Sequence, residues 1–112
     1  LLDAQRLVRR VPVGDGVVDG ILDLVRNSRP ETTSLPEVRA NVAWGPGPRA
    51  SQALMLAARA RAVLDGRLSP SLDDVLALAA PVLRHRMALN FAARADGLTL
   101  DGLIERLCAP LR

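Results

Sequence analysis

The stretch that decides the fold is residues 44–66, which read WGPGPRASQALMLAARARAVLDG. Two Gly-Pro steps lead at once into a run rich in alanine and leucine, which are strong helix formers. Pro48 suits the first helical position, because its fixed φ is already helical and its missing N–H needs no partner there. Gly66 suits a left-handed helix end. The sequence therefore predicts a helix over residues 48–65, about 27 Å long.

Apolar residues cover two sides of this helix, so we expect it to be central, with other helices packed against both sides. One side holds Ala50, Ala53, Leu54, Ala57, Arg61 and Leu64, and the other holds Leu56, Ala60 and Val63. Arg59 and Arg61 are interpreted as solvated side chains.

Arg49 is the candidate binding residue. It follows Pro48, so it lies in the first turn, where the helix dipole places partial positive charge. An arginine there costs about 0.3 to 1 kcal/mol unless an anion lies in front of it. Free N–H groups and a guanidinium together suit a phosphate. From spacing alone, an ordinary surface arginine remains the alternative.

Composition limits the function. The chain has 112 residues, which is enough for one domain with a single core. Its 15 basic residues are all arginine, so it lacks the lysine that a P-loop requires. Twelve acids are interleaved with them and leave a net charge of +3, with no basic run that would track a nucleic acid. No signal peptide or membrane span is visible, and we interpret the chain as a fragment of a cytoplasmic protein.

The first half of the chain predicts two further helices. Residues 1–11 have apolar side chains at helical spacing, and Asp15 is placed to cap a second helix that ends at Pro30. Residues 30–36 are polar and predict a loop. Residues 38–44 alternate between apolar and other side chains, which fits a short strand or an extended lead into the next helix. The buried side of the second helix is expected to hold Val18, Ile21, Leu22 and Val25.

The second half predicts a fourth helix, a short fifth helix and a final helix. Ser71 and Asp74 resemble a capping box. Pro81 should interrupt the fourth helix near Ala80, because proline removes a helical hydrogen bond. Residues 82–87 then form the short fifth helix. Residues 90–97 are predicted to be a connection. Thr99 then caps the final helix, which ends at Pro110. The apolar side of this helix is expected to hold Leu100, Leu103, Ile104 and Leu107.

A few single residues could carry chemistry, but each has a simpler interpretation. Trp44 is expected to be a buried anchor beneath the Gly-Pro turn. His85 is the single histidine, so it is interpreted as a surface or partly packed imidazole and not as a metal ligand. Cys108 is interpreted as a packed thiol. Arg84 and Arg86 are interpreted as a solvated pair, with contact to a neighbouring subunit as the alternative. The fold class is therefore all-α, a small bundle of five to six helices with at most a minor strand.

Four motifs in one order resemble the C-terminal helical lid of MoxR-type AAA+ ATPases. That family has a Gly-Ala-Ser-Pro-Arg-Ala motif opening a long helix, an Asp-Gly-Arg turn, a Thr-Pro-Asp-Asp-Val helix start and a Val-Leu-Arg-His-Arg segment. Residues 45–50, 65–67, 71–75 and 82–86 match them in turn. The resemblance extends over nearly the whole chain. Pro46 and Gly47 depart from the motif by replacing alanine and serine, and Leu72 replaces a proline.

This resemblance implies that Arg49 is the sensor-two arginine, which contacts the γ-phosphate of ATP. The ATP and Mg²⁺ would be held mainly by a preceding P-loop domain outside this chain, so the fragment alone would bind no cofactor and have no ATPase activity. The resemblance further implies a homo-oligomeric ring, expected to be a hexamer, that remodels protein partners in a chaperone-like manner. A von Willebrand factor A domain protein is an expected partner. Nucleic acid and membrane are not.

Two other classes of function remain open on the sequence. A helix-turn-helix module would use the arginine surplus to bind DNA, with residues 59–67 as the best candidate for a recognition helix. A helical adaptor with no link to nucleotide is the third interpretation. A P-loop and an acidic Walker B strand upstream of Leu1 would distinguish the lid from the adaptor.

Overall fold

The computed structural model describes residues 13–111, and its first element is helix α2, Asp15–Ser28. Gly14 is the N-cap and Asp15 is the first helical residue, so the N-cap lies one residue earlier than the predicted cap, Asp15. Ile21 and Val25 are buried as expected, together with Leu24. Leu22 was expected to be buried but is 49% exposed, because it lies on the outward side of the helix. The helix predicted over residues 1–11 lies outside the described residues.

The segment predicted as a strand or extended lead divides into a helix and a strand. Helix α3, Pro36–Asn41, begins because proline is preorganised for the first turn, and strand β1 follows as Val42–Trp44. β1 pairs antiparallel with β2, Ala88–Leu89, in the register Val42↔Leu89 and Trp44↔Ala88 with an irregularity between them. The helical half was missed, and the minor strand is confirmed.

Helix α4, Arg49–Leu64, is the long helix that the sequence predicted. Its buried side chains recur every four residues, at Ala50, Leu54, Ala58 and Ala62, and the helix packs against both α2 and α5. It ends in a left-handed turn at Gly66, whose φ is 73°. The N–H of Gly66 bonds to the carbonyl of Val63, and the N–H of Arg67 bonds to that of Ala62. These two bonds form a Schellman motif.

Helix α5, Leu72–Leu83, is continuous through Pro81, so the predicted break is wrong. Pro81 is exposed and lies in the last turn, where its missing N–H leaves one helical bond unmade near an end that is already open to solvent. The predicted helix over residues 82–87 does not form. Its first residues complete α5, and Met87 leads into β2.

The chain ends in two short helices and a 3₁₀ turn. Residues 90–97 were predicted as a connection but contain helix α6, Phe91–Ala95, whose N-cap Asn90 accepts a hydrogen bond from Ala93. Helix α7, Leu100–Cys108, is capped by Thr99 as predicted, through a bond from the N–H of Gly102 to the Thr99 hydroxyl. The 3₁₀ turn η1, Ala109–Leu111, follows.

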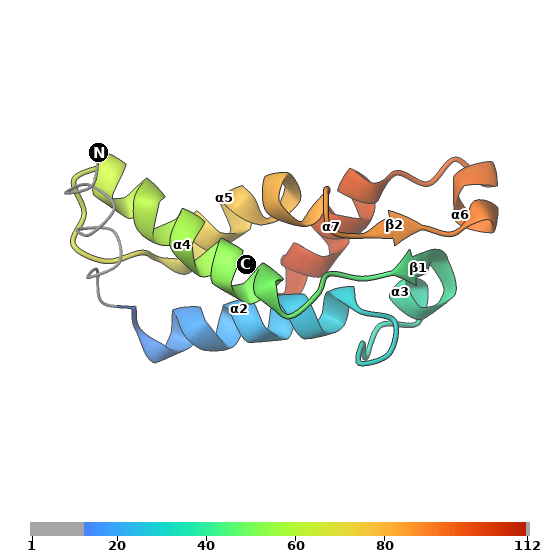
Figure 1. Ribbon diagram of the computed structural model, residues 1–112, viewed down its shortest axis with the longest axis horizontal. Helices are drawn as coiled ribbons and strands as arrows, with labels where there is room; N and C mark the ends of the chain where they lie inside the picture. Colours follow the sequence, from blue (N-terminus) through green and yellow to red (C-terminus); the bar gives the residue numbers. More distant parts are fainter. Residues whose placement is uncertain (1–12, 112) are drawn as a thin grey trace.

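The helices form an elongated bundle of 46 × 26 × 21 Å with the two-stranded ribbon at one end (Figure 1). α2 and α5 pack against each other and against both α4 and α7. The ribbon, α3 and α6 extend from the bundle at the end opposite the α4–α5 turn (Figure 1). This arrangement confirms the all-α class. Within residues 13–111, no helix has both the length and the apolar character needed to cross a bilayer.

Candidate functional site

The loop that leads into α4 is held tightly against the end of α2. A Cβ atom on Gly45 would lie 2.7 Å from the Cα of Arg29 and 2.8 Å from the carbonyl oxygen of Ser28, so only glycine fits without a shift of backbone. Pro46 is fully buried next to it. The start of α4 therefore has a position fixed by its contact with α2.

α4 begins at Arg49, one residue later than predicted. Pro48 already has helical dihedral angles, with φ −60° and ψ −25°, and the N–H of Ala50 bonds to the carbonyl of Gly47. A difference of one residue at a helix end is within the usual variation of assignment. Arg49 thus lies in the first turn, as the sequence indicated.

The first turn of α4 differs from those of the other long helices. It contains no acidic residue and no side-chain cap, whereas acids occupy the first turns of α2, α5 and α7. The Arg49 side chain is exposed, and within residues 13–111 it makes no hydrogen bond or ion pair. The positive end of α4 and a free guanidinium therefore face solvent together, an arrangement that suits an anion.

Trp44 is not the buried anchor that the sequence predicted. Its side chain is 55% exposed, and the buried residue of the turn is Pro46. The alternation of a regular strand would place Trp44 on the same side as Val42, but the ladder is irregular between these two residues, and only Val42 is buried. Phe91 is 88% exposed, so both aromatic residues of the chain lie on the surface.

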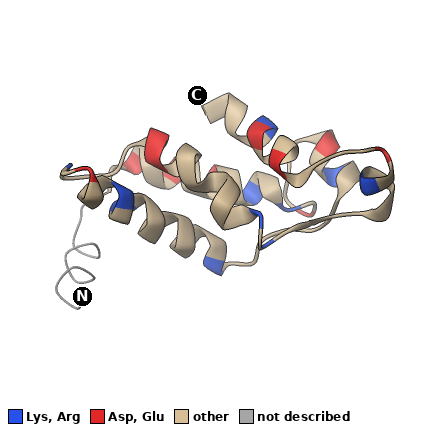
Figure 2. Cartoon of the chain, turned by 90° about the horizontal axis from the view of Figure 1, so that it is seen from above, with Lys and Arg blue, Asp and Glu red and all other residues tan. Residues whose placement is uncertain are grey.

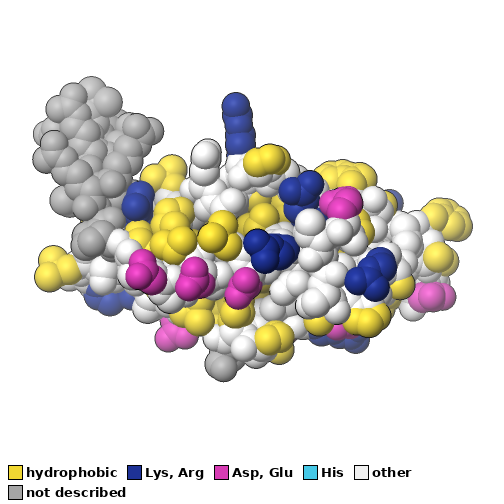
Figure 3. All heavy atoms as spheres, turned by 90° about the horizontal axis from the view of Figure 1, so that it is seen from below, with side chains coloured by type: hydrophobic (Ala, Val, Ile, Leu, Met, Phe, Trp, Pro, Cys, Tyr) yellow, Lys and Arg dark blue, Asp and Glu magenta, His cyan; other side chains and the backbone are white. Residues whose placement is uncertain are grey.

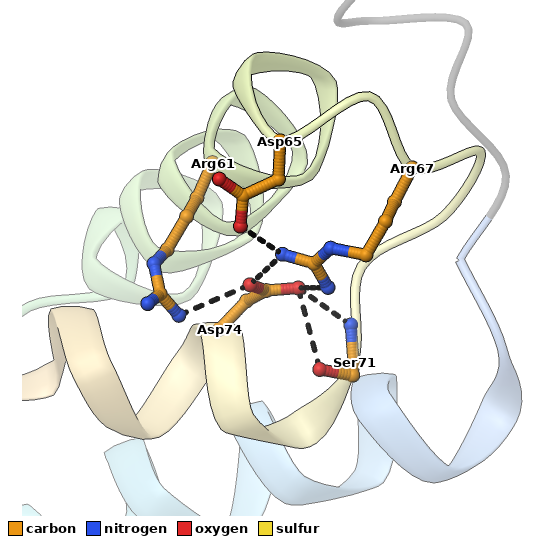
Figure 4. Close-up of polar contacts among 5 residues, drawn as sticks. All are labelled: Arg61, Asp65, Arg67, Ser71 and Asp74. Carbon is orange, nitrogen blue, oxygen red and sulfur yellow. Dashed lines mark hydrogen bonds and ion pairs between the residues drawn. The ribbon is translucent and has the colours of Figure 1, made fainter.

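The opposite end of α4 is closed by an ion-pair network around Asp74 (Figure 4). Asp74 is buried, and its Oδ2 accepts bonds from Arg67 Nη1 at 2.8 Å and from the N–H of Ser71 at 2.7 Å. Arg61 Nη1 reaches Oδ1 at 3.1 Å, and Arg67 also bonds to Asp65 at 3.0 Å. The predicted reach of Asp74 back to Ser71 is confirmed. The interpretation of Arg61 as a solvated side chain is wrong.

The charges in this network shift one another's pKa values. Hydrogen bonds from Arg67 lower the pKa of Asp74 from 3.8 to about 2, although burial acts in the opposite direction. The same bonds, with a smaller contribution from Asp65, raise the pKa of Arg67. Both groups are therefore charged at neutral pH. The sequence signals for this network were the Ser71–Asp74 capping box and the Asp-Gly-Arg turn, and neither indicated that Arg61 and Arg67 pair with Asp74.

The segment around His85 carries an ion pair that the sequence did not predict. Arg84 and Arg86 are exposed, as expected for a solvated pair, and Arg84 also forms a forked ion pair with Asp101 of α7, with both bonds at 2.9 Å. Arg86 donates to the carbonyl of Val82, and His85 is exposed. Cys108 is buried, as expected for a packed thiol. No group of three or more His, Cys, Asp or Glu side chains with metal-binding geometry occurs in the described part of the chain.

Comparison with known proteins identifies the fold. The model of the AAA lid domain family matches residues 37–107, which is more than half of the chain and runs from α3 to α7. The chain belongs to the AAA lid domain family. Together with the relatives described next, this match confirms the sequence-based recognition of a MoxR-type lid, and Arg49 lies inside the matched region.

Three relatives of this AAA lid domain agree with that assignment. Chaperone MoxR1 from Mycobacterium tuberculosis is 34% identical over 108 residues, which cover 96% of this chain and 29% of that protein. The uncharacterized protein YeaC from Bacillus subtilis is 32% identical over 108 residues, covering 96% of this chain and 31% of that protein. The crystal structure of a protein assigned as an ATPase from Cytophaga hutchinsonii ATCC 33406 superposes with a TM-score of 0.86 and 26% identity. That match covers 93% of this chain and 32% of the other. This chain thus spans about a third of the length of the relatives it matches.

Proposed function

We propose that this lid belongs to a MoxR-type AAA+ ATPase and that Arg49 is its sensor-two arginine, in contact with the γ-phosphate of ATP. The ATP and its Mg²⁺ would be bound by a P-loop domain of the same protein. The observation that carries the proposal is the exposed Arg49 guanidinium, which has no partner within residues 13–111, at the uncapped first turn of α4. The residues present therefore fit an anionic ligand.

The chemistry of a guanidinium suits this role. It remains charged at all physiological pH values and donates forked hydrogen bonds to phosphate oxygens. The helix dipole adds attraction for the same oxygens. When the γ-phosphate leaves, these bonds are lost, and the lid is free to move relative to the P-loop domain.

The rest of the lid is built to transmit such a movement. Gly45 holds the start of α4 against α2, and the Asp74 network fixes its far end to α5. We expect α2, α4 and α5 to move as one body when Arg49 gains or loses its ligand. The hydrolysis step would then be coupled to a change in the position of the whole lid.

The partners follow from the same proposal. We infer a ring of identical subunits, a hexamer, located in the cytoplasm and acting on protein partners in a chaperone-like manner. A von Willebrand factor A domain protein is the expected protein partner of such a ring. The name of one relative, Chaperone MoxR1, supports the chaperone class.

The DNA-binding alternative has little support in the contacts. Its candidate recognition segment, residues 59–67, contains three arginines, and two of them, Arg61 and Arg67, are paired with Asp74, which leaves only Arg59. Arginines held by a buried carboxylate are not available for phosphate or base contacts. The ATP turnover experiment described next distinguishes the adaptor alternative from the lid.

The test is ATP turnover by the complete protein with Arg49→Ala, Arg49→Lys and a control substitution, Arg94→Ala. Removal of a preorganised cation from a phosphoryl-transfer site costs roughly 10²-fold or more in turnover. We expect that loss for Arg49→Ala and only partial recovery for Arg49→Lys, because lysine cannot form the forked contact. Arg94 is exposed on α6 and should have no effect. Unchanged turnover and unchanged nucleotide-dependent assembly in Arg49→Ala would refute the assignment.

A further inference from the structure

α4 carries an outward side, with one exposed leucine among polar residues, that no described element covers. Its core side chains point toward α2 and α5, so helical spacing places Gln52, Leu56 and Arg59 on the outward side. Leu56 is 46% exposed. A shallow groove runs along this side and is lined by Ser51, Gln52, Met55, Leu56 and Arg59.

This outward face of α4, defined here by Gln52, Leu56 and Arg59, is also positively charged. α4 contains three arginines and no acidic residue. Arg61 is paired with Asp74, but no described residue accepts a hydrogen bond from Arg59, and its Nε is enclosed without a partner. A ligand for this face should therefore present a carboxylate beside an apolar side chain.

The outward face of α2 has that composition. Asp15, Asp19 and Asp23 follow one another at intervals of four residues, so they form a row on one side, and Leu22 lies beside them. All four are exposed, and the aspartates make no ion pair with residues 13–111. Figure 3 shows this row of acidic side chains with hydrophobic side chains next to it. Like charges four residues apart repel each other, so a cation placed beside Asp19 and Asp23 would relieve this repulsion.

We propose that the outward face of α4 in one copy of this chain binds the outward face of α2 in a second copy. Leu56 would pack against Leu22, and Arg59 would lie among the three aspartates. The two faces have similar lengths, about 11 Å from Gln52 to Arg59 and about 12 Å from Asp15 to Asp23. Because they lie on different helices, the contact is heterologous and can repeat from copy to copy.

The contact is separate from the nucleotide role of Arg49. It would add a direct lid-to-lid contact to the proposed ring, and it requires neither ATP nor a P-loop domain. Asp19→Arg lies on α2, away from Arg49, and should weaken this contact without changing the nucleotide role of Arg49, so failure of the nucleotide proposal and failure of this one can be told apart.

The experiment is sedimentation of the 112-residue chain over a range of concentrations, with Arg59→Glu, Asp19→Arg and the double variant. We expect weak self-association of the unaltered chain that decreases at high salt. Each single reversal places like charges together and should weaken association at least about tenfold, and the double variant should return to within about threefold of the original. Arg94→Glu and Asp96→Arg, which make the same charge changes on α6 and its C-cap, should have no effect.

Several outcomes would overturn the proposal. The first is that the unaltered chain remains monomeric up to about 1 mM. The second is that the α6 control substitutions weaken self-association as much as Arg59→Glu and Asp19→Arg do. The third is that the double variant associates no more tightly than the single variants. Circular dichroism checks that each variant is folded. If Arg59→Glu does not fold, Leu22→Asp on the exposed side of α2 tests the same contact from the other face.

Discussion

The two ends of α4 use the same residue type in opposite ways. At the C-terminal end, Arg61 and Arg67 are tied to the buried carboxylate of Asp74 (Figure 4). At the N-terminal end, Arg49 has no partner within residues 13–111. Figure 2 shows how few acidic side chains lie along α4, in contrast to the neighbouring helices. An arginine stabilises the fold where a buried acid needs it and is available to a ligand where only a helix dipole faces it.

The two ends of α4 therefore have different roles in the lid. We call the C-terminal end, where Arg61 and Arg67 pair with Asp74, the closed end, and the N-terminal end, at Arg49, the open end. The closed end sets the geometry of α4 and α5, because a buried carboxylate is costly unless its oxygens are fully bonded. At the open end, the charge of Arg49 is stabilised only when an anion binds in front of the helix. Substitutions at the closed end should therefore change stability, and those at the open end should change ligand response.

The largest effect is expected for Asp74→Ala. It removes an acceptor used by Arg61, Arg67 and the N–H of Ser71, so the free energy of unfolding should fall by about 3 kcal/mol. Urea denaturation measures the change. The matched control is Asp73→Ala, an exposed acid in the same helical turn, for which we expect less than about 1 kcal/mol. Equal losses in the two variants would mean that the closed end is held by something else.

Acid should weaken the closed end in a defined pH range. The pKa of Asp74 is about 2 in the folded chain, below its ordinary value of 3.8. Its stabilising effect is therefore fully present above about pH 4 to 5 and is lost as the pH falls through about 2, a contribution of about 2 kcal/mol. The unfolding free energies of the original chain and of Asp74→Asn, compared from about pH 6 downwards, should converge by that amount. A constant difference between them would contradict the pairing.

The open end can be disturbed without touching its arginine. Gly45→Ala would push a methyl group against the backbone of Ser28 and Arg29, so we expect a loss of about 1.5 kcal/mol and a displaced Arg49. Gly47→Ala is the control, since a Cβ there meets nothing within 4 Å. Thermal unfolding of both variants gives the stability, and ATP turnover of the complete protein gives the positioning effect. If both glycines tolerate alanine equally, the contact with α2 does not fix the start of α4.

The parts of the fold that could be predicted are those determined by near neighbours in the sequence. The Thr99 hydroxyl accepts a hydrogen bond from the N–H of Gly102, only three residues later. Gly66 ends α4 through hydrogen bonds within the same turn. The parts that failed depend on the surroundings. Pro81 is tolerated because it lies in an exposed last turn, and Trp44 is exposed where the pairing of β1 with β2 becomes irregular.

The candidate site shows the same limit. Arg49 could be found because its motif is local, with a proline before it and a helix after it. The partners of Asp74 could not, because Arg67 and Arg61 lie 7 and 13 residues away and approach it only after the α4–α5 turn has formed. The pairing of Arg84 with Asp101, 17 residues apart, was missed for the same reason.

The smallest predicted effect tests the comparison between the two ends most directly, because its sign is unusual. Arg49→Ala removes a cation from the positive end of a 16-residue helix, so the chain alone should become more stable by about 0.5 kcal/mol. Arg26→Ala is the matched control, since Arg26 is exposed in the last turn of α2, where a cation is favourable. Its removal should lower stability by a similar amount. Both changes should shrink at high salt, measured as the midpoint of urea unfolding. A loss of stability in Arg49→Ala would mean that Arg49 already has a partner within the fold, and the guanidinium at the open end would then be paired like those at the closed end.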